Sequence, residues 1–367
     1  MLKPRLTVAV RTLVAFALQT GDLASTFAGS QRPLDGLRAH QKIQRARPAG
    51  YQPEVALQHA IETPDFVLEI SGRLDGVFTD GDRVVIDEIK STHKELDAFE
   101  HNPDPLHWGQ VQAYAWLYAT HHDLDAVDAQ LTYYQLTTKD TREFRRTYPL
   151  DELNRLMTAL LDDYVAWATR LERWRLQRDQ SIRGLGFPFD DFREGQRQMA
   201  VTVYRSIQTD GRAMIQAPTG IGKTMAALFP ALKALGEGLT AKLFYLTART
   251  TGRQAAEKAL SVMRRRGLQV KSLTLTAKDK LCPYPDATCT PEECPRARGH
   301  FDRMKGARLA AFDRDALDRD TVTRLADAFE VCPFEFSLEM ALWMDTIVGD
   351  YNYVFDPRVY LRRFFAE

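Results

Sequence analysis

The sequence has no excess of either charge and few cysteines. Its 367 residues contain 49 Lys and Arg against 49 Asp and Glu, so any nucleic-acid contact must come from local grooves. Four clustered cysteines do not suit a disulfide framework. No apolar run approaches the length of a membrane span, and no repeat or low-complexity segment is present. The length and the 44% of hydrophobic residues fit an ordinary soluble protein with two domains.

The start of the chain is basic and then apolar, which faintly resembles a signal peptide. However, Arg11 interrupts the apolar stretch, and no small-residue cleavage site follows it. We therefore expect an amphipathic first helix and a cytoplasmic protein.

The clearest motif is a glycine-rich stretch. Residues 217–224 read APTGIGKT, which fits the phosphate-binding pattern G-x-x-x-x-G-K-[ST] except for the alanine at its first position. Gly220 and Gly222 let the backbone curl so that its N–H groups can point at phosphate oxygens. Lys223 is then expected to reach the β and γ phosphates of ATP, and the Thr224 hydroxyl to bind Mg²⁺.

The elements expected around this loop support nucleotide binding. The apolar run 213–215 predicts a strand, and the Ala/Leu-rich pattern of 225–235 predicts a helix whose positive end faces the same anion. The alternative is a glycine-rich turn without a ligand. We rank it well below, because strand, loop, Gly-Lys-Thr and helix occur in the required order.

A second motif places two carboxylates and a lysine on a hairpin. Residues 66–92 contain two β-rich runs on either side of an Asp-Gly pair, a strong hairpin signal. Side chains two positions apart share a face of a strand, so Glu88 and Lys90 point the same way and Asp87 points away. Asp75, on the preceding run, can come close across the hairpin. Burying these charges is costly unless something compensates them, as a divalent metal would.

With these residues the first part of the chain resembles the PD-(D/E)xK nucleases of the RecB type. The resemblance rests on segments in the family's order, including a Gln-x-x-x-Tyr pair on one helical face: Gly36, His40, Gly72, Asp75, Glu88, Lys90, Gln110 and Tyr114. It implies that Asp75, Glu88 and His40 bind Mg²⁺ or Mn²⁺, hard ions that oxygen-rich ligation suits. It also implies that Lys90 orients or activates the attacking water. Gln110 and Tyr114 would position the DNA backbone or the lysine.

Each of these elements alone is common in proteins of other kinds. Glu88 and Lys90 could form a solvated ion pair of little energetic value, and a helical histidine such as His40 is usually a surface or packed residue. All the elements in order within one small domain make the nuclease interpretation the stronger one. An inactive, DNA-gripping relic of the fold would keep much of the same pattern.

The middle of the chain predicts a connector. Residues 151–183 carry leucines and aromatic residues at helical spacing, and a glycine-containing break follows near residue 184. The segment 189–196 then resembles the adenine-reading segment of superfamily 2 helicases, which implies that the Gln196 amide bonds the base edge. An aspartate-capped helix start is the alternative, and both can hold.

A further strand is expected after the P-loop helix. Residues 242–247 read as a buried strand, so strand, helix and strand form a βαβ unit of a parallel, RecA-like sheet. The following Thr-Ala-Arg-Thr stretch resembles motif Ia of the XPD/DinG helicases, where a loop contacts single-stranded DNA phosphates. The resemblance implies that Arg249 makes this sequence-independent contact.

The cysteines suggest a metal site. They are separated by six, four and thirty-seven residues, and no Cys-x-x-Cys pair occurs, which counts against an ordinary zinc finger. Four thiolates suit either Zn²⁺ or an iron–sulfur cluster, and the spacing does not decide between them. The segment resembles the insert that follows motif Ia in XPD-like helicases. That resemblance implies a [4Fe–4S] cluster held by Cys282, Cys289, Cys294 and Cys332.

Residues 345–357 resemble the segment that follows this insert, but no DEAH or DEAD box and no later arginine-bearing motif occurs before Glu367. Phosphoryl transfer needs that acid for Mg²⁺ and an arginine for the developing charge. We therefore expect the chain to bind ATP without hydrolysing it well or unwinding DNA alone. We also expect it to be part of a longer polypeptide.

The predicted fold class is α/β, with a restriction-endonuclease-like domain before a partial RecA-like domain. We predict a RecB-like nuclease domain at 1–150, a helical connector at 151–186 and the first part of helicase domain 1 at 187–277. An iron–sulfur insert at 278–340 and a return to the helicase domain at 341–367 follow. The predicted function is an ATP-dependent DNA helicase and nuclease of DNA repair or processing, acting on single-stranded or forked DNA. The alternatives are a non-catalytic DNA-binding module with a regulatory nucleotide site, and a zinc-structured P-loop protein.

Overall fold

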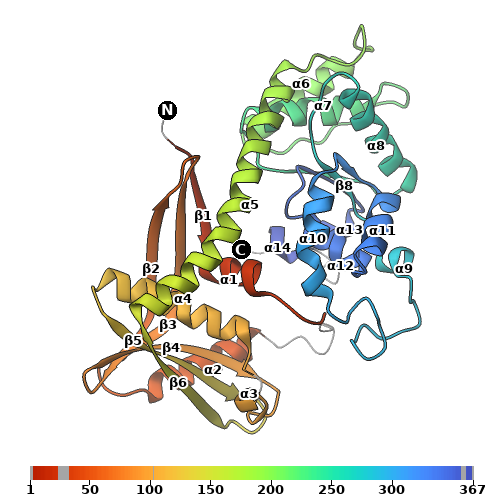
Figure 1. The fold of residues 1–367 in the computed structure, drawn as a ribbon. Coiled ribbons are helices and arrows are strands. Elements are labelled where there is room, and N and C mark those ends of the chain that lie inside the picture. The colour runs from red at the N-terminus through yellow and green to blue at the C-terminus, as the bar shows by residue number, and fades with distance from the viewer. Residues whose placement is uncertain (1–2, 24–32, 102, 357–360, 366–367) are drawn as a thin grey trace. The chain divides into compact units, whose positions relative to one another are not determined.

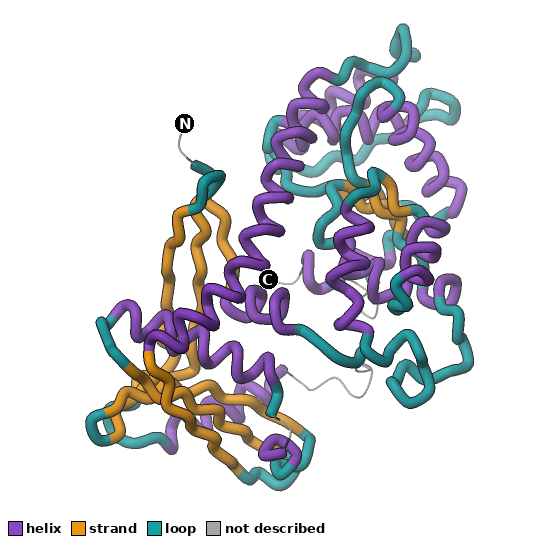
Figure 2. The backbone as a smooth tube through the Cα atoms, viewed as in Figure 1, coloured by secondary structure: helices purple, strands orange, loops and turns teal. Residues whose placement is uncertain are grey.

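The fold is that of a computed structural model, which describes residues 3–23, 33–101, 103–356 and 361–365 (Figure 1). Helices and strands alternate along much of the described chain (Figure 2). None of the described helices is both long enough and apolar enough to cross a membrane.

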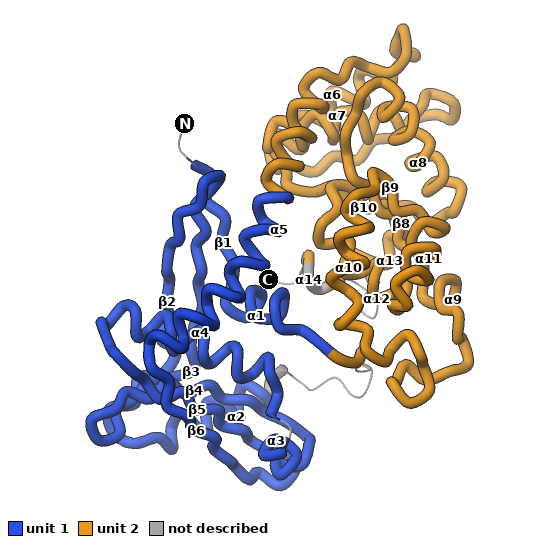
Figure 3. Tube along the Cα trace, in the orientation of Figure 1, with its two compact units in different colours: residues 1–20, 25–170 blue, residues 21–24, 171–367 orange. Residues whose placement is uncertain are grey.

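The chain divides into two compact units (Figure 3). Unit 1 contains residues 1–20 and 25–170, and unit 2 contains residues 21–24 and 171–367. The long helix α5 (Leu150–Gly184) begins in unit 1 and ends in unit 2, and the structure confirms the single helix predicted from its leucine and aromatic spacing.

Unit 1 is built on a six-stranded sheet. Its strands are β1 (Arg5–Ala9), β2 (Gln52–Glu62), β3 (Val67–Asp80), β4 (Arg83–Thr92), β5 (Ala126–Gln135) and β6 (Thr141–Pro149). They follow the order β1-β3-β4-β5-β6, with β2 also paired to β3. The β1–β3 and β4–β5 pairs are parallel, whereas β2–β3, β3–β4 and β5–β6 are antiparallel. The β3–β4 pair is the predicted hairpin.

Helices cover both faces of this sheet. They are α1 (Val10–Leu18), α2 (Pro33–Ala46), α3 (Ala98–His101) and α4 (Pro105–His121). Ile86 of β4 belongs to the apolar core that α1 and α4 share, whereas Ile89, three positions later, packs against Ala39 and Ile43 of α2. Because side chains alternate along a strand, α2 and α4 lie on opposite faces.

The first helix begins later than the sequence indicated. Residues 5–9 form β1, which pairs in parallel with residues 67–71 of β3, and only then does α1 begin. The expectation that the whole start forms an amphipathic helix is therefore wrong. The alternating burial of β1 is the pattern of a half-buried strand, and it shows only once the partner strand is known.

β3 and β4 are paired over only part of their lengths. Their register runs from Asp80 opposite Arg83 to Gly76 opposite Asp87. On the other side of Gly76, β3 pairs with β1 and β2, while β4 beyond Asp87 pairs with β5. The two strands thus separate at the Gly76–Asp87 pair, and we call this point the sheet fork.

Unit 2 contains a four-stranded parallel sheet in the order β7-β10-β8-β9. Its strands are β7 (Leu243–Leu246), β8 (Ser272–Thr274), β9 (Ala316–Leu317) and β10 (Thr346–Gly349). The helices are α6 (Gln196–Gln208), α7 (Lys223–Gly236), α8 (Thr250–Arg264), α9 (Lys278–Leu281), α10 (His300–Phe312), α11 (Arg319–Ala328), α12 (Pro333–Met340), α13 (Asn352–Phe355) and α14 (Arg362–Phe365). The predicted parallel sheet is confirmed.

The strand predicted ahead of the P-loop is wrong. Residues 211–218 belong to no helix or strand, and the Met214 side chain is fully exposed. A strand exists only through pairing, and the described sheet offers this segment no paired neighbour. Of the segment 345–357, Pro357 lies outside the described residues.

Candidate functional site

The sheet fork brings the predicted nuclease residues together. Asp75 lies directly beyond the last β3–β4 pair, and its Oδ2 atom accepts a hydrogen bond from the backbone N–H of Ile89 at 2.7 Å. Lys90 Nζ donates to Glu88 Oε1 at 2.7 Å, so the two side chains share a face as predicted. Both carboxylates and the lysine therefore lie on the two strands just beyond the fork.

Helices on opposite faces of the sheet complete the site. From α2, His40 Nδ1 lies 3.2 Å from Asp75 Oδ1, and from α4, Gln110 Oε1 accepts a hydrogen bond from Lys90 Nζ at 2.8 Å. The start of α4 is fixed by Asp104, whose side chain accepts hydrogen bonds from the backbone N–H groups of residues 106 and 107. Gln110 is thus carried by a helix whose N-terminus is capped.

Glycines allow aromatic rings to cover the strand that carries Asp75. A Cβ at Gly72 would lie 2.7 Å from the Tyr114 ring, and one at Gly76 would overlap the Tyr51 ring. Tyr114 is therefore packed on the strand beside the site, and burial raises its pKa to about 12. The glycines at 72 and 76 are a sequence signal of close approach that could have revealed Tyr51.

The electrostatics of the site favour a cation. Glu88 is only 4% exposed, and its Oε2 atom accepts no hydrogen bond from the described residues. Burial, with the nearby charge of Asp75, raises the pKa of Glu88 to about 7, although Lys90 opposes the rise. The hydrogen bond to Asp75 raises the pKa of His40. Lys90 pairs with one oxygen of this buried carboxylate, and a divalent cation would stabilise the other.

The donor set fits a hard divalent ion in chemistry, but it is not a finished cage. Two carboxylates and an imidazole are suitable ligands for Mg²⁺ or Mn²⁺. Among the described residues, no group of three or more His, Cys, Asp and Glu side chains is arranged to hold an ion. His40 and Asp75 contact each other, so an ion would have to replace that contact.

The sequence interpretation missed a buried cluster beneath the fork. Asp87, which points away from Glu88 as predicted, is fully buried and forms a two-pronged pair with Arg47, which follows α2. Tyr51, Thr132 and Gln130 also donate to this carboxylate. Arg47 and Asp87 lie 40 residues apart, and no local pattern links them.

The P-loop is an exposed turn ahead of α7. Gly220 and Gly222 have φ angles of 89° and 81°, a left-handed conformation that glycine adopts freely. Lys223 Nζ donates to the carbonyl oxygens of Ala217 and Pro218 at 3.1 and 2.8 Å. The Thr224 hydroxyl accepts from the Tyr245 hydroxyl at 3.3 Å. The predicted loop is thus curled by its glycines, and among the described residues its lysine hydrogen-bonds only to carbonyls of its own loop.

Gln196 lies against this loop and is buried. Its side-chain amide donates to the Gly222 carbonyl at 3.3 Å and accepts from the Arg193 N–H at 3.0 Å. A Cβ at residue 222 would overlap this amide. Both ends of the amide are therefore engaged by backbone. Arg249, the predicted DNA contact, is exposed and forms the N-cap position of α8.

The cysteines do not form a preformed cage either. Lys278 Nζ donates to Cys289 Sγ at 2.8 Å, and this hydrogen bond raises the pKa of the lysine. Burial raises the pKa of Cys332 to about 11. The His300 Nδ1 atom accepts from the Cys332 backbone N–H at 3.1 Å. Cys294 is buried.

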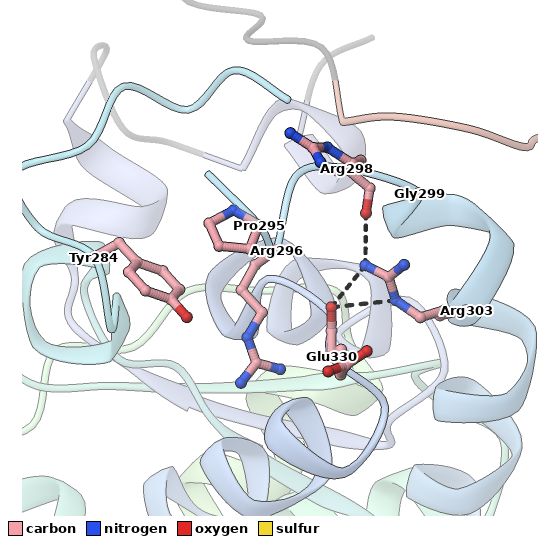
Figure 4. A pocket seen from close by; sticks show the side chains of 7 residues that line it. All are labelled: Tyr284, Pro295, Arg296, Arg298, Gly299, Arg303 and Glu330. Atoms are coloured by element: carbon pink, nitrogen blue, oxygen red, sulfur yellow. Dashed lines mark hydrogen bonds between the residues drawn. The ribbon is translucent and has the colours of Figure 1, made fainter. Parts of the chain in front are cut away.

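Arginines brace the segment that carries these cysteines. A cavity of ≈ 260 Å³ lies among Arg296, Arg298 and Arg303 (Figure 4). Arg303 donates to the carbonyl oxygens of Arg298 and Glu330, and Arg296 donates to the carbonyl oxygen of Ala326. These bonds join the start of α10 to the end of α11, so they hold the loop of Cys294 near that of Cys332.

Comparisons with known proteins match two successive parts of the chain. Residues 15–194 match the family model of the PD-(D/E)XK nuclease superfamily, and residues 193–281 match that of the DEAD/DEAH box helicases. The second match ends before the first cysteine.

Two curated relatives are helicases. A regulator of telomere elongation helicase 1 homolog of Anopheles gambiae is 23% identical over 228 residues, which cover 47% of this chain and 23% of the relative. The general transcription and DNA repair factor IIH helicase subunit XPD of Arabidopsis thaliana is 26% identical over 208 residues, 47% of this chain and 27% of the relative. The chain thus spans about a quarter of the length of these relatives. A solved XPD helicase is 20% identical, with a TM-score of 0.34, over 49% of this chain and 31% of that one.

Proposed function

We propose that this chain, in which a PD-(D/E)XK nuclease superfamily region is followed by a DEAD/DEAH box helicase region, cuts DNA with the first and binds ATP with the second. It would serve as part of a nuclease–helicase in DNA repair or processing. Single-stranded or forked DNA is the proposed substrate.

One observation supports metal-dependent cutting above all others. Glu88 is buried with an unpartnered oxygen, next to Asp75 and in contact with Lys90. A surface ion pair would be solvated and would leave no buried orphan atom. The proposed ligands of Mg²⁺ or Mn²⁺ are Asp75, Glu88 and His40.

The other side chains have proposed roles around these ligands. When bound, a divalent ion would lower the pKa of a coordinated water and stabilise charge on the phosphate. Lys90 would orient the attacking water, and Gln110 would hold its ammonium, which it already contacts at 2.8 Å. Tyr114 would fix the strand that carries Asp75 and border the DNA backbone.

The second unit would hold ATP. Gly220 and Gly222 leave the loop backbone free to surround phosphates, Lys223 would exchange its loop carbonyls for phosphate oxygens, and Thr224 would bind Mg²⁺. Gln196 would shape the loop and read the base. Arg249 would contact a DNA phosphate.

The four cysteines would hold an iron–sulfur cluster, which would structure this part of the helicase. The arginine hydrogen bonds that hold the loop of Cys294 near that of Cys332 support a common ligand. The proposed domain limits place the nuclease at 1–150 and the insert at 278–340. Anaerobically prepared protein should then be brown, whereas colourless protein containing one zinc ion would exclude the cluster.

The decisive test is cleavage of end-labelled single-stranded DNA in Mg²⁺ or Mn²⁺ by the wild type and by Asp75→Ala, Lys90→Ala and Lys223→Ala. We expect the first two changes to lower the cleavage rate by roughly 10²–10⁴-fold and the third to leave it unchanged. If the wild type grips DNA without cutting it, the unit is a binding module. If Asp75→Ala cuts normally, the site is misassigned.

A further inference from the structure

The sheet fork creates a structural problem that the hairpin alone does not solve. Where β3 and β4 separate, Asp75 loses its ladder partner, and its backbone carbonyl must find another donor. Two side chains supply it, because Gln44 Nε2 donates at 3.0 Å and the Tyr51 hydroxyl at 3.3 Å. Both belong to residues 44–51, which we call the strap.

The strap is anchored at its centre by a buried ion pair. Arg47 Nε and Nη2 donate to the two carboxylate oxygens of Asp87 at 2.9 and 3.0 Å. The Arg47 side chain is 10% exposed and that of Asp87 is 0% exposed. A planar, two-pronged pair fixes direction as well as distance. Asp87 is the last β4 residue paired with β3, so the anchor lies at the fork itself.

The cluster around this pair leaves little freedom. The Thr132 hydroxyl and the Gln130 amide donate to Asp87 Oδ1 at 2.6 and 3.1 Å. The single hydrogen of the Tyr51 hydroxyl is shared between Asp87 Oδ2, at 3.2 Å, and the Asp75 carbonyl oxygen, at 3.3 Å, while the ring covers Gly76. One tyrosine therefore touches both the buried carboxylate and the backbone of Asp75. A rigid path joins Asp87 to the proposed metal ligand.

The strap also continues directly from the helix that carries His40. Gln44 lies one helical turn after His40 on α2, and α2 ends at Ala46, next to Arg47. His40 Nδ1 contacts Asp75 Oδ1, while Gln44 contacts the carbonyl of the same residue. Fixing Arg47 therefore fixes the position of α2 relative to Asp75.

We propose that Arg47, through its buried pair with Asp87 and through Tyr51, is a positioning residue that holds Asp75 and His40 beside each other, where a divalent ion would replace their contact. The inference rests on the proposed nuclease function. Arg47 touches neither DNA nor metal in this account. It acts on the site as outer partners of metal ligands do, and loss of such partners typically costs about 10–100-fold in metal affinity.

A double substitution separates positioning from stability. Arg47→Gln alone leaves the Asp87 charge buried without its cation and should lower the melting temperature strongly. Arg47→Gln combined with Asp87→Asn removes both charges and keeps an amide oxygen for Thr132 and Gln130. The double variant should regain most of the thermal stability. Tyr51→Phe, which keeps the ring over Gly76 and removes only the hydroxyl, is a milder second variant.

The measurements are Mn²⁺ affinity by electron paramagnetic resonance and hydrogen exchange of the peptide that contains Ile89, all in the full chain. We expect the double variant and Tyr51→Phe to bind Mn²⁺ about tenfold more weakly or worse, and to exchange faster at Ile89, whose N–H Asp75 holds. Arg142→Gln is the control, because that arginine pairs with Asp97 and Glu100 away from the cluster. It should leave both readouts unchanged.

The possible outcomes distinguish the positioning role of Arg47 from the metal site itself. Wild-type Mn²⁺ affinity and wild-type exchange in both variants would overturn the positioning role, even if Asp75→Ala abolishes binding. If Asp75→Ala binds Mn²⁺ as the wild type does, the metal site itself is wrong, and the positioning role fails with it. Faster exchange with weaker binding, at an unchanged melting temperature, would establish the proposal.

Discussion

The two candidate sites of this chain are built in opposite ways. At the sheet fork, Asp75, Glu88, Lys90 and Gln110 are tied to one another or to backbone, and the central carboxylate is buried. At the P-loop, Lys223 hydrogen-bonds to carbonyl oxygens of its own loop, and the preceding residues 211–216 are exposed.

The difference shows where each site obtains its specificity. The fork holds its charges in a buried, low-dielectric place, where every misplacement is costly and where an ion gains most. The loop binds through backbone N–H groups and a flexible ammonium. These groups become ordered only when a phosphate binds. We therefore expect substitutions at the fork to trade stability against activity, and substitutions of the polar loop side chains to affect binding more than stability.

The Glu88→Gln substitution should have the largest effect, and it tests whether the fork trades stability against activity. It should lower the cleavage rate by at least about 10²-fold, while the melting temperature stays the same or rises, because a buried charge that is costly to desolvate is removed. Cleavage kinetics and thermal unfolding of one preparation check both expectations. A fall in melting temperature of several degrees with only mildly reduced cleavage would show that Glu88 and Lys90 form a structural ion pair.

The Lys223→Ala substitution tests the exposed P-loop in the same way. Charge-assisted hydrogen bonds contribute about 1.5–3 kcal/mol each, so ATP should bind roughly 10–100-fold more weakly. Because the ammonium hydrogen-bonds to two carbonyls of its own exposed loop, the melting temperature without nucleotide should not change. Titration of labelled ATP and thermal unfolding measure the two effects. Lys233→Ala is an instructive contrast, since Lys233 donates to three backbone carbonyls near the end of α5 and its loss should lower stability.

A matched pair of glycine substitutions sharpens the contrast further. A Cβ at Gly76 would overlap the Tyr51 ring, so Gly76→Ala should cost about 1–3 kcal/mol of stability in unit 1. Gly220→Ala meets no atom within 4 Å, and its cost should be about 1 kcal/mol, from the left-handed φ of 89° alone. Hydrogen exchange resolved by peptide assigns each loss to its unit. Equal losses would mean that the fork is less tightly packed than its contacts indicate.

What the sequence predicted and what it missed follow the same division. Local patterns identified the hairpin, the shared face of Glu88 and Lys90 and the glycine-curled loop, since each depends on neighbours in sequence. The Arg47–Asp87 pair was missed because it joins residues 40 apart through an irregular strap. The strand expected at 213–215 failed for a related reason, since pairing depends on a distant partner that local hydrophobicity does not reveal.

The smallest expected effect is the dependence of metal binding on pH, and it runs against the dependence of folding. Burial raises the pKa of Glu88 from 4.5 to about 7, with Asp75 adding to the rise and Lys90 and His40 opposing it. Binding an ion requires the charged form, so Mn²⁺ affinity should increase about tenfold between pH 6 and pH 8. His40→Gln should bind more weakly but keep this slope if Glu88 is its source.

The metal-free fold binds more protons than the unfolded chain between pH 4.5 and 7, so Glu88 contributes stability that is lost as the pH rises through 7. The difference in melting temperature between wild type and Glu88→Gln should therefore shrink as the pH falls, and a difference that is constant with pH would place Glu88 in contact with solvent.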